Sequence, residues 1–592
     1  MPILTDVHQQ FAAYFPSPRL QPYLYLLSKK LSEGHICIDL ATVHSEEWLA
    51  AGYTDWVTAQ ELQKELLVTA GDTLSPFVLF NNRLYLQRYF NYETIILNRI
   101  NSFINTAEEQ TAQRILAVEA QVPFIKQLFT PVNTGVPIGD NTNWPLVAGI
   151  TAVINNFTII TGGPGTGKTT TVAKILAILY TLYPNLTVAL AAPTGKAAAR
   201  MAESLKSAAL QVNESIQAKF TKLEPATIHR LLGPIKNKPL FKHHSQRQLD
   251  YDVVIADESS MIDVALFAKL MDAIGPNTRL ILLGDKDQLA SVEAGSLFGD
   301  LCQAQPYLNK LTPSRAALIN LFIDGEKDKI NADHIVETIN HPLFQHIIEL
   351  QRSHRFLDSE GIGKFSKAII NNREADIQYF FSNKDEQVFI DTSYSSSVFE
   401  QFVNGYLHFI KEKNISLALK KLNQLRVLCA VKAGEQGLYA TNKKIEKYLQ
   451  QQGAIQLTGD FYENRPVMVT NNNYELQLFN GDIGIIRPDE MGTLKAWFEA
   501  DNGEVRSVLP GYIAHAETVY AMTIHKSQGS EFNQVMVCLP KGDNFPILTR
   551  ELLYTAVTRA KQKVLVLGSE ALILATAAAS VQRGSGINDR FI

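Results

Sequence analysis

The stretch GGPGTGKTT at residues 162–170 constrains the fold of this chain more than any other feature of its sequence. It fits the pattern G-x-x-x-x-G-K-[ST], and it stands between a β-branched apolar run, FTIIT (157–161), and a segment with helical periodicity. A phosphate-binding loop needs that context, because the loop N–H groups and the helix N-terminus converge on one anion. The motif therefore predicts an α/β domain built on a parallel sheet.

Other apolar runs alternate with longer helical stretches and extend this prediction to two parallel sheets. The first sheet is expected to hold 157–161, 187–192, 252–257 and 279–285, and the second 426–431, 534–539 and 563–568. Residues from about 455 to 520 have the pattern of short strands with turns, which predicts a small β insertion. Near the N-terminus, FVLFNNRLYLQRYF predicts two strands joined by a turn at Asn81 and Asn82.

Composition excludes several classes of protein. The net charge of -4 and the pI near 6.4 give no global sign of a polyanion partner, so any nucleic-acid site must be local. The four cysteines are scattered without a CxxC pair, which argues against structural zinc and fits a reducing cytoplasm. The N-terminus lacks the features of a signal peptide, and no apolar run reaches the length of a membrane span. We expect a cytoplasmic protein without a membrane partner.

The residues of a nucleotide-hydrolysing site accompany the loop. Lys168 is expected to neutralise β- and γ-phosphate oxygens, and the Thr169 hydroxyl to ligate Mg²⁺. VVIADES places Asp257 and Glu258 directly after a strand, where one acid holds Mg²⁺ and a base orients the attacking water. LLGDKDQLASVEAGS then places Gln288, an amide that can bond phosphate and water, beyond a third strand.

These patterns assign two sets of residues. ATP is expected to contact the loop and one acid: Gly162, Gly163, Pro164, Gly165, Thr166, Gly167, Lys168, Thr169, Thr170 and Asp257. The metal ion is expected at Thr169 and Asp257.

The second α/β domain has no phosphate loop of its own. It offers isolated arginines beside short signature runs instead: Arg355 in LQRSHRF and Arg559 in YTAVTRAKQKV. In a motor with two such domains the nucleotide lies in the cleft between them, and arginines from the second domain complete the site. Together with Lys168, Glu258 and Gln288, both arginines are candidate catalytic residues.

The ordered motifs GGPGTGKTT, AAPTGKAAARM, TIHRLLG, ADESSM, LLGDKDQLASVEAG, QRSHRF, MTIHKSQGSEF and YTAVTRA resemble those of superfamily 1 DNA helicases. Within that superfamily the chain is similar to the RecD family, the alpha subunits of bacterial exodeoxyribonuclease V. LYLQRYFNYE and NNNYELQLFNGDIGII also resemble this family, so the similarity spans almost the whole chain.

The resemblance implies a set of DNA contacts. The HKSQG loop of such helicases lies at the domain interface, close to both single-stranded DNA and nucleotide. Strand contacts are therefore expected at Pro193, Thr194, Lys196, Thr227, His229, Arg230, Thr523, His525 and Lys526, and a nucleotide-sugar contact at Glu531. Residues 196–248 hold ten Lys or Arg against three Glu, a local basic patch in an acidic chain. A solvated basic face is the alternative explanation of that patch.

The resemblance also implies the architecture: α/β, with two RecA-like parallel-sheet motor domains, a small SH3-like β-barrel insertion and a small α+β N-terminal domain. The Pro-, Gly- and Asn-rich segment 130–145 is the clearest linker. Expected boundaries are 1–107 for an N-terminal subunit-docking domain, 108–345 for the first motor domain, 346–455 and 521–592 for the two parts of the second, and 456–520 for the insertion.

As function, the resemblance implies an ATP- and Mg²⁺-dependent helicase that moves 5′ to 3′ on single-stranded DNA. It would unwind double-stranded DNA ends for recombinational repair and degradation, together with the beta and gamma subunits of exodeoxyribonuclease V. A self-sufficient RecD-like helicase is the alternative. A kinase or remodelling ATPase does not account for HKSQG and VTRA, and a vestigial ATPase does not account for the complete residue set. No metal-binding carboxylate cluster of a nuclease is recognisable outside the ATPase site.

One departure from the family pattern concerns the base. Members usually carry a Gln that reads the adenine edge shortly before the phosphate loop, whereas NWPLVAG places Pro145 there. Proline has no amide side chain, so selectivity for adenine is expected to be looser or to come from the backbone. The first hundred or so residues carry no motor motif and no basic run. They are expected to be either a stabilising cap on the first motor domain or, as the resemblance implies, a docking domain for the gamma subunit.

Overall fold

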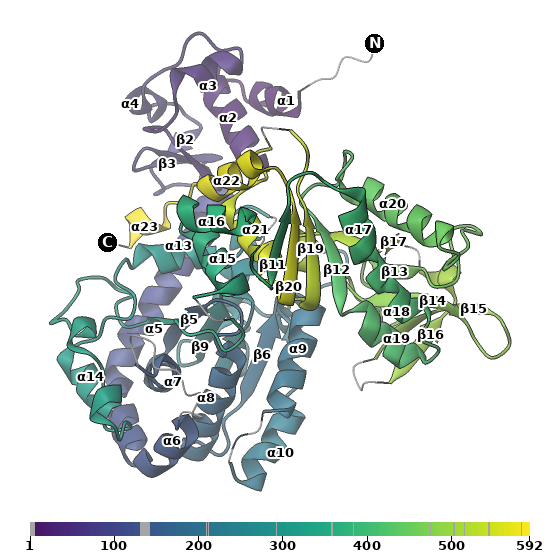
Figure 1. Cartoon of the computed structure of the whole chain (residues 1–592). Coiled ribbons are helices and arrows are strands. Elements are labelled where there is room, and N and C mark those ends of the chain that lie inside the picture. Colours follow the sequence, from purple (N-terminus) through teal and green to yellow (C-terminus); the bar gives the residue numbers. More distant parts are fainter. Residues whose placement is uncertain are drawn as a thin grey trace.

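The structure is a computed structural model of the 592-residue chain (Figure 1). It describes residues 6–591 except 131–141, 209, 211, 292, 296, 357–358, 383, 474, 501–503, 514, 543–544 and 582, and it leaves out the side chains of 106–109. Most of the predicted linker at 130–145 therefore lies outside the described residues.

The first motor domain is built on a six-stranded sheet in the order β10-β5-β9-β8-β6-β7, and every pairing in it is parallel. Its strands are β5 (Phe157–Gly162), β6 (Val188–Ala192), β7 (Ala226–Thr227), β8 (Val253–Ala256), β9 (Arg279–Gly284) and β10 (Ile347–Leu350). Its helices are α6 (Val122–Phe129), α7 (Trp144–Ile154), α8 (Lys168–Leu182), α9 (Gly195–Lys206), α10 (Glu214–Lys222), α11 (Ile228–Leu232), α12 (Val264–Ala273), α13 (Leu297–Ala304) and α14 (Pro313–Asn320). The four strands predicted for this sheet are confirmed.

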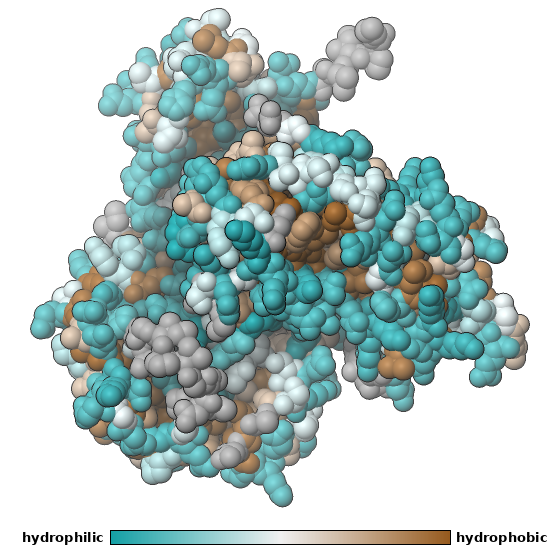
Figure 2. All heavy atoms as spheres, viewed as in Figure 1, coloured by the Kyte–Doolittle hydropathy of each residue, from teal (hydrophilic) through white to brown (hydrophobic). Residues whose placement is uncertain are grey.

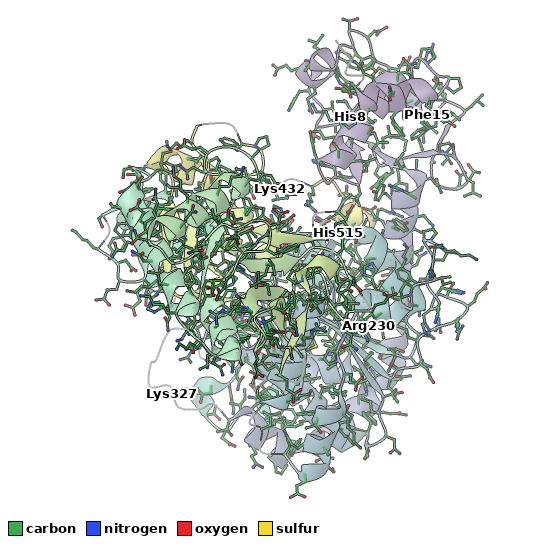
Figure 3. The ribbon with its side chains drawn as sticks, turned by 90° about the vertical axis from the view of Figure 1, so that its right-hand side faces the viewer. His8, Phe15, Arg230, Lys327, Lys432 and His515 are labelled. Carbon is green, nitrogen blue, oxygen red and sulfur yellow. The ribbon has the colours of Figure 1, made fainter. Side chains whose placement is uncertain are left out.

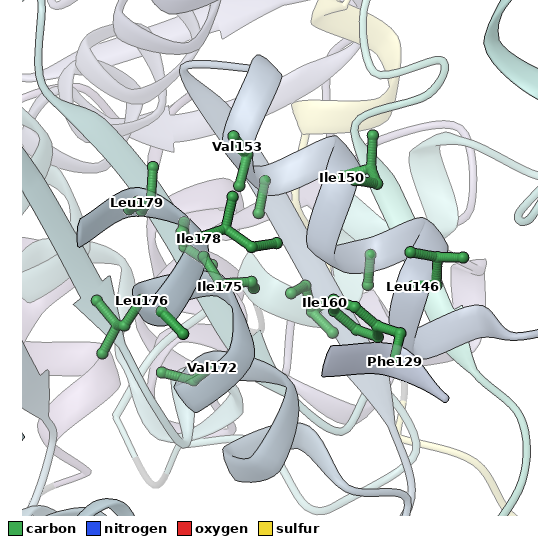
Figure 4. Close-up of a cluster of buried hydrophobic side chains, with 14 of the residues drawn as sticks. Phe129, Leu146, Ile150, Val153, Ile160, Val172, Ile175, Leu176, Ile178 and Leu179 are labelled. Carbon is green, nitrogen blue, oxygen red and sulfur yellow. The ribbon is translucent and has the colours of Figure 1, made fainter. Parts of the chain in front are cut away.

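Buried faces on both sides of this sheet explain why its strands are apolar throughout rather than alternating. On one side α7 and α8 pack their aliphatic side chains against Ile160 of β5 (Figure 4). On the other side α12 and the long helix α5 (Gln87–Glu119) cover Phe157 and Leu280. This double-sided core holds β5 rigidly, and the phosphate loop follows directly from its carboxyl end.

The second motor domain has a five-stranded parallel sheet in the order β11-β20-β19-β12-β18. Its strands are β11 (Val388–Asp391), β12 (Leu425–Cys429), β18 (Ala521–Thr523), β19 (Phe532–Cys538) and β20 (Ala560–Leu567). Its helices are α15 (Gly361–Ile370), α16 (Glu374–Phe381), α17 (Ser396–Val403), α18 (Leu407–Ile410), α19 (Ile415–Leu422), α20 (Leu438–Gln451), α21 (Arg550–Val557) and α22 (Glu570–Ala578). The three strands predicted here are confirmed, and β11 and β18 are additional.

The predicted β insertion is a five-stranded antiparallel sheet with a small core of its own around Ile486 and Phe498. Its strands are β13 (Pro466–Val469), β14 (Ile483–Pro488), β15 (Leu494–Glu499), β16 (Val505–Val508) and β17 (Ala516–Thr518), in the order β16-β15-β14-β13-β17. The pairings between described residues form an open sheet, so an SH3-like barrel stays a prediction.

The N-terminal domain combines helices with a four-stranded sheet in the order β1-β4-β3-β2, and it projects from the rest of the molecule (Figures 1 and 3). Its elements are α1 (Val7–Tyr14), α2 (Gln21–Ser32), β1 (Cys37–Asp39), α3 (Ser45–Ala50), α4 (Ala59–Leu62), β2 (Val68–Thr69), β3 (Phe77–Phe80) and β4 (Arg83–Leu86). The predicted hairpin turn is confirmed, since Asn81 and Asn82 have φ of 48° and 59° as a primed turn requires.

Two predicted boundaries do not coincide with the elements. Helix α5 runs through residue 107 without a break, because its apolar face continues from the N-terminal domain onto the first motor domain. Strand β10 pairs with β5, so the first sheet extends past residue 345. The short helix α23 (Ile587–Arg590) returns to pack on α13 and α5 of the first motor domain. None of the described helices is both long and apolar enough to cross a membrane.

Candidate functional site: the cleft between the motor domains

The phosphate loop joins β5 to α8. Gly165 and Gly167 have φ of 79° and 83°, a left-handed backbone conformation that glycine adopts without strain and that a tight phosphate-binding turn uses. Lys168 donates from Nζ to the carbonyl oxygens of Gly162 and Gly163 at 2.6 and 3.1 Å, so its ammonium group lies inside the loop. This is the position from which a lysine can reach β- and γ-phosphate oxygens.

Acidic residues follow the carboxyl ends of the neighbouring strands. Asp257 follows β8, and burial together with the charge of Glu258 raises the pKa of its carboxyl to about 6. Glu258 adopts φ of 51°, a costly conformation for a residue with a side chain and one that is concentrated at functional sites. Asp285 follows β9, and burial and Asp287 raise its pKa to about 6 as well. The Lys168 charge acts on both Asp257 and Asp285 and opposes these shifts, so the three groups face one region.

Gln288 is buried at the boundary between the domains. Its Nε2 donates to Asp285 at 2.9 Å, and the Tyr554 hydroxyl of α21 donates to the same carboxylate oxygen at 3.1 Å. The next residue, Leu289, accepts a bond from Gln528 Nε2 at 2.6 Å and donates its N–H to Thr555 at 2.8 Å. The segment after β9 is thus held by the second motor domain on both sides.

The two predicted arginines both lie at this cleft. Arg355 touches the phosphate loop: a Cβ on Gly165 would be 2.4 Å from the Arg355 Cβ, and His354 N–H donates to the Gly165 carbonyl at 2.8 Å. Its Nη2 pairs with Glu531, while its Nη1 is buried without a partner in the described structure. Arg559 is only 3% exposed, and its guanidinium bonds the carbonyls of Thr555 and Ser530.

Glu531 is the centre of a cluster of positive charges. Arg200 of α9 lies 2.7 Å from its Oε2, Lys561 of β20 lies 3.3 Å from the same oxygen, and Arg355 holds Oε1. Burial alone would raise the pKa of Glu531, but these three cations hold it at about 2. Through this one carboxylate the cluster links Arg200 of the first motor domain, Arg355, which follows β10, and Lys561 of the second motor domain.

The predicted DNA contacts of the first motor domain lie at adjacent strand ends. Pro193 and Thr194 follow β6, Thr227 ends β7, and these two strands pair in parallel. Each threonine caps a helix: Thr194 accepts from Ala197 N–H and Thr227 from Arg230 N–H, both at 3.2 Å. His229 and Arg230 are both exposed on α11, and Figure 3 shows Arg230.

The predicted DNA contacts of the second motor domain follow β18. Thr523 ends that strand and accepts from the N–H of Lys526, whose Nζ lies 2.9 Å from Glu517. Burial, aided by Arg583 and Lys432, lowers the pKa of His525 below its ordinary 6.5, so this imidazole is neutral at pH 7.

The two groups of predicted DNA contacts meet at α9. A Cβ on Gly529 would lie 3.7 Å from Ala197 and 4.0 Å from Thr194, and Arg200 Nη1 donates to the Gly529 carbonyl at 2.8 Å. Lys196, one turn before Arg200, is half-buried, and burial with the charges of Arg426 and Arg200 lowers its pKa to about 7.

Sequence reasoning missed four residues of this cleft: Arg200, Asp285, Gln528 and Tyr554. Arg200 follows Lys196 by four residues in AAPTGKAAARM, so helical spacing could have placed both on one face. Asp285 directly follows a strand, as Asp257 does, and that position was the available signal.

Pro145 lies in the first turn of α7, where Asn143 caps the helix through Leu146 N–H at 3.1 Å. A proline suits that position because it needs no N–H there.

The chain matches three family models. They are the N-terminal domain of RecBCD enzyme subunit RecD over residues 3–85, an AAA domain over 147–294 and a UvrD-like helicase C-terminal domain over 518–567. The second and third cover the phosphate loop with the acids, and the loop that holds His525 and Glu531.

Curated relatives match over most of the chain. RecBCD enzyme subunit RecD of Mycolicibacterium smegmatis is 32% identical over 596 residues, which cover 97% of this chain and 94% of the relative. The same subunit of Haemophilus influenzae is 34% identical over 482 residues, covering 76% and 72%. The ATP-dependent RecD2 DNA helicase of Deinococcus radiodurans is 27% identical and covers 70% of this chain but only 47% of the helicase. The chain therefore belongs to the RecD family, the ATP-dependent DNA helicase subunits of RecBCD enzymes.

Proposed function

We propose that this subunit moves 5′ to 3′ along single-stranded DNA by hydrolysing ATP, and that it unwinds double-stranded DNA ends together with the beta and gamma subunits (RecB and RecC). The observation that carries the proposal is the arrangement between the two domains. Arg355 touches the phosphate loop and pairs with Glu531, and the charge of Glu531 also acts on the buried Arg559. A motor of this kind hydrolyses nucleotide only when both domains contribute to one site.

Each residue of the cleft has a role in hydrolysis. Lys168 neutralises charge on the β- and γ-phosphate oxygens, and Arg355 and Arg559 stabilise the charge that develops on the transferred group. Gln288 orients the attacking water, and Glu258 accepts its proton. Because Gln288 and Tyr554 share the Asp285 carboxylate, a shift of the second motor domain also shifts the group that positions water.

Mg²⁺ fits the acidic side of this site. Magnesium is usually bound by one or two protein oxygens, phosphate oxygens and water. Thr169 offers a hydroxyl next to Lys168, and Asp257 offers a half-buried carboxylate that has no ion-pair partner among the described residues. A bound cation would stabilise the ionised form of that carboxylate, whose pKa burial has raised. When bound, Mg²⁺ would supply charge neutralisation between the β- and γ-phosphates.

The DNA path is proposed along the adjacent strand ends of the two domains, with contacts at Thr194, Lys196, Thr227, Thr523 and Lys526. Nucleotide and DNA are coupled by short connections. Gln528 of the DNA-side loop bonds Leu289, next to the water-orienting Gln288, and Arg200 connects α9 to Glu531. Closing the cleft around ATP therefore moves the two groups of DNA contacts relative to each other.

A helicase that works without partner subunits is the alternative function. The RecD2 helicase of Deinococcus radiodurans is matched over 47% of its length, whereas the mycobacterial RecD subunit is matched over 94%. The N-terminal family model is also that of the RecBCD subunit. These observations favour a subunit of the heterotrimer.

Unwinding assays on tailed duplexes test the proposal. The chain alone and the chain assembled with the beta and gamma subunits are given duplexes with a 5′ or a 3′ single-stranded tail, and ATP hydrolysis is followed in parallel. We expect unwinding from the 5′ tail, and we expect Lys168→Ala to abolish the contribution of this subunit. The matched control is Lys327→Ala, a change at an exposed residue far from the cleft (Figure 3). Unwinding by the wild-type chain only from a 3′ tail would overturn the polarity.

A further inference from the structure

A polar pocket of about 620 Å³ opens on the first motor domain at the end of the sheet opposite to the phosphate loop. Its walls are the second half of α5, the loop between α8 and β6 and the loop between α12 and β9. Arg279 is the first residue of β9, whereas the phosphate loop follows the carboxyl end of β5. The pocket is therefore separate from the nucleotide site, and its volume is in the range of small-molecule sites.

Two buried arginines line this pocket, Arg114 and Arg279, each 6% exposed. Arg114 donates from Nη1 to the Ile154 carbonyl at 2.9 Å and from Nη2 to Gln110, both of them neutral acceptors. Arg279 lies over the ring of Tyr183 at 5.2 Å, and its Nε is buried without a hydrogen-bond partner. Within the described part of the chain neither guanidinium has an ion-pair partner.

The two charges repel each other. Burial and, after it, the charge of Arg279 lower the pKa of Arg114 to about 10. One acid lies in the wall, Asp252. Its charge acts on Arg279, but in the described structure it forms no ion pair with either guanidinium, and its Oδ2 accepts from the N–H and the hydroxyl of Thr187 at 2.7 and 2.8 Å. Two neighbouring buried cations without an ion-pair partner among the described residues are costly unless something in the pocket compensates them.

Strand register adds a further polar group. Phe157 pairs with Leu280, and both belong to the core that α12 and the first half of α5 cover. The residues before them, Asn156 and Arg279, therefore point to the opposite face of the sheet. Asn156 is fully buried, and neither its Nδ2 nor its Oδ1 has a hydrogen-bond partner. One unsatisfied donor of Arg279 and both unsatisfied polar atoms of Asn156 thus lie at the ends of neighbouring strands on the same face of the sheet.

We propose that this pocket binds an oxyanion, a phosphoryl or carboxylate group, held by Arg114 and Arg279. Guanidinium groups bind such planar or tetrahedral oxyanions through paired N–H donors, and a buried oxyanion would remove the repulsion between them. The amides of Gln113, Asn185 and Asn277 line the same walls and can orient the rest of the ligand. The oxyanion could belong to a small phosphorylated or carboxylated metabolite, or to an acidic side chain of another subunit.

Isothermal titration with inorganic phosphate tests the site in the full chain. A non-hydrolysable ATP analogue with Mg²⁺ fills the phosphate loop and a saturating single-stranded oligonucleotide fills the DNA path, and ionic strength is kept constant with chloride. We expect one additional phosphate per chain. Arg114→Gln and Arg279→Gln should each weaken that binding at least tenfold. Arg373→Gln, which removes an exposed arginine paired with Asp376, should leave it unchanged.

Variants that fail to fold are recognised by their melting temperature, and Arg279→Lys provides a second test, because it keeps the charge but loses the paired donors. Succinate in place of phosphate shows whether carboxylates are accepted. Phosphate uptake by the isolated chain but not by the assembled heterotrimer would assign the oxyanion to a partner side chain, and uptake by both would assign it to a small ligand. Absence of the additional phosphate in the isolated wild-type chain, or its persistence in folded Arg114→Gln and Arg279→Gln chains, overturns the proposal.

Discussion

We predict that the second motor domain contributes to ATP hydrolysis most directly through Arg559. Its guanidinium is buried, with no ion pair in the described structure, and Glu258 and Glu531 are the nearest sources of opposing charge. A buried arginine held only by carbonyls is suited to meet negative charge that appears during the reaction. We expect Arg559→Ala to bind nucleotide with a Kd close to that of the wild type and to lower kcat by about 10²–10³.

The measurement for Arg559 is DNA-stimulated ATP hydrolysis beside equilibrium nucleotide binding. Arg550→Ala at the other end of α21 is the matched control, because Arg550 bonds the carbonyls of Ile370 and Ala578 away from the cleft. Arg559→Lys keeps the charge and should recover part of the rate. A raised Kd with unchanged kcat would make Arg559 a ground-state contact.

We predict that Lys196 makes DNA binding depend on pH. Its ordinary pKa is 10.5, and burial lowers it to about 7 in the free protein. A DNA phosphate would raise it again, so binding takes up a proton and affinity falls as pH increases above 7. We expect the Kd for single-stranded DNA to rise by up to about tenfold per pH unit between pH 7 and 9.

The comparison for this effect is Lys196→Arg, which stays charged and should flatten the profile. Lys206→Arg changes an exposed lysine on the same helix and should retain the wild-type slope. In the free protein His525 is neutral over this range, because burial lowers its pKa below its ordinary 6.5. A wild-type profile as flat as that of Lys196→Arg would show that Lys196 is not a DNA contact.

At the scale of helices and strands, local sequence predicted most elements and could not predict their junctions. The apolar strands and the phosphate loop are specified by residues within about ten positions, and the structure has all of them. The Glu531 cluster joins Arg200 to a residue more than three hundred positions away, and no local pattern contains that pairing. The boundary at 107 was missed for a related reason: α5 has one continuous apolar face that serves two domains.

Arg200 connects helix α9 to the loop after β18, and we predict that it couples DNA binding to hydrolysis. Its guanidinium bridges the Glu531 carboxylate and the Gly529 carbonyl. Arg200→Ala should lower the DNA stimulation of ATP hydrolysis about fivefold, since a half-exposed charged contact contributes roughly 1 kcal/mol. Basal hydrolysis should change less. The number of base pairs unwound per ATP should fall as well.

Lys561→Ala is the matched control for Arg200, because Lys561 contacts the same carboxylate oxygen but belongs to the same domain as Glu531. Removing Lys561 weakens the charge cluster without cutting the connection between domains. Equal losses of DNA stimulation in the two variants would show that the charge of the cluster matters and the interdomain bridge does not.

Considered as a whole, the molecule holds its N-terminal domain with segments from both ends of the chain. The domain has a separate hydrophobic core between residues 12 and 84. Arg83 of strand β4 forms an ion pair with Asp589 of the C-terminal segment at 2.8 Å, and the Ile36 N–H donates to the Gly584 carbonyl at 3.1 Å. Arg590 in turn pairs with the buried Glu93 of α5 at 3.0 Å.

The visible face of the molecule is mainly hydrophilic (Figure 2), yet Leu66 and Leu74 of the N-terminal domain are 99% and 94% exposed.

These contacts decide where the N-terminal domain can be removed. A chain that starts near Glu108 would lose the part of α5 whose side chains, such as Ile100 and Phe103, belong to the core of the first motor domain. That chain is expected to misfold. A chain that starts at Gln87 keeps α5 and the Glu93–Arg590 pair. What it lacks is the N-terminal domain, a unit with its own core.

We predict that the chain starting at Gln87 retains DNA-stimulated ATP hydrolysis but does not co-purify with the beta and gamma subunits. Leu66→Asp with Leu74→Asp in the full chain should weaken assembly in the same direction, because a charge on an exposed apolar side chain opposes burial in an interface. Met491→Asp, at a position 93% exposed in the β insertion, is the matched control. Normal assembly of the shortened chain would exclude docking as the role of this domain. Loss of hydrolysis with a lowered melting temperature would instead make the domain a stabilising cap on the first motor domain.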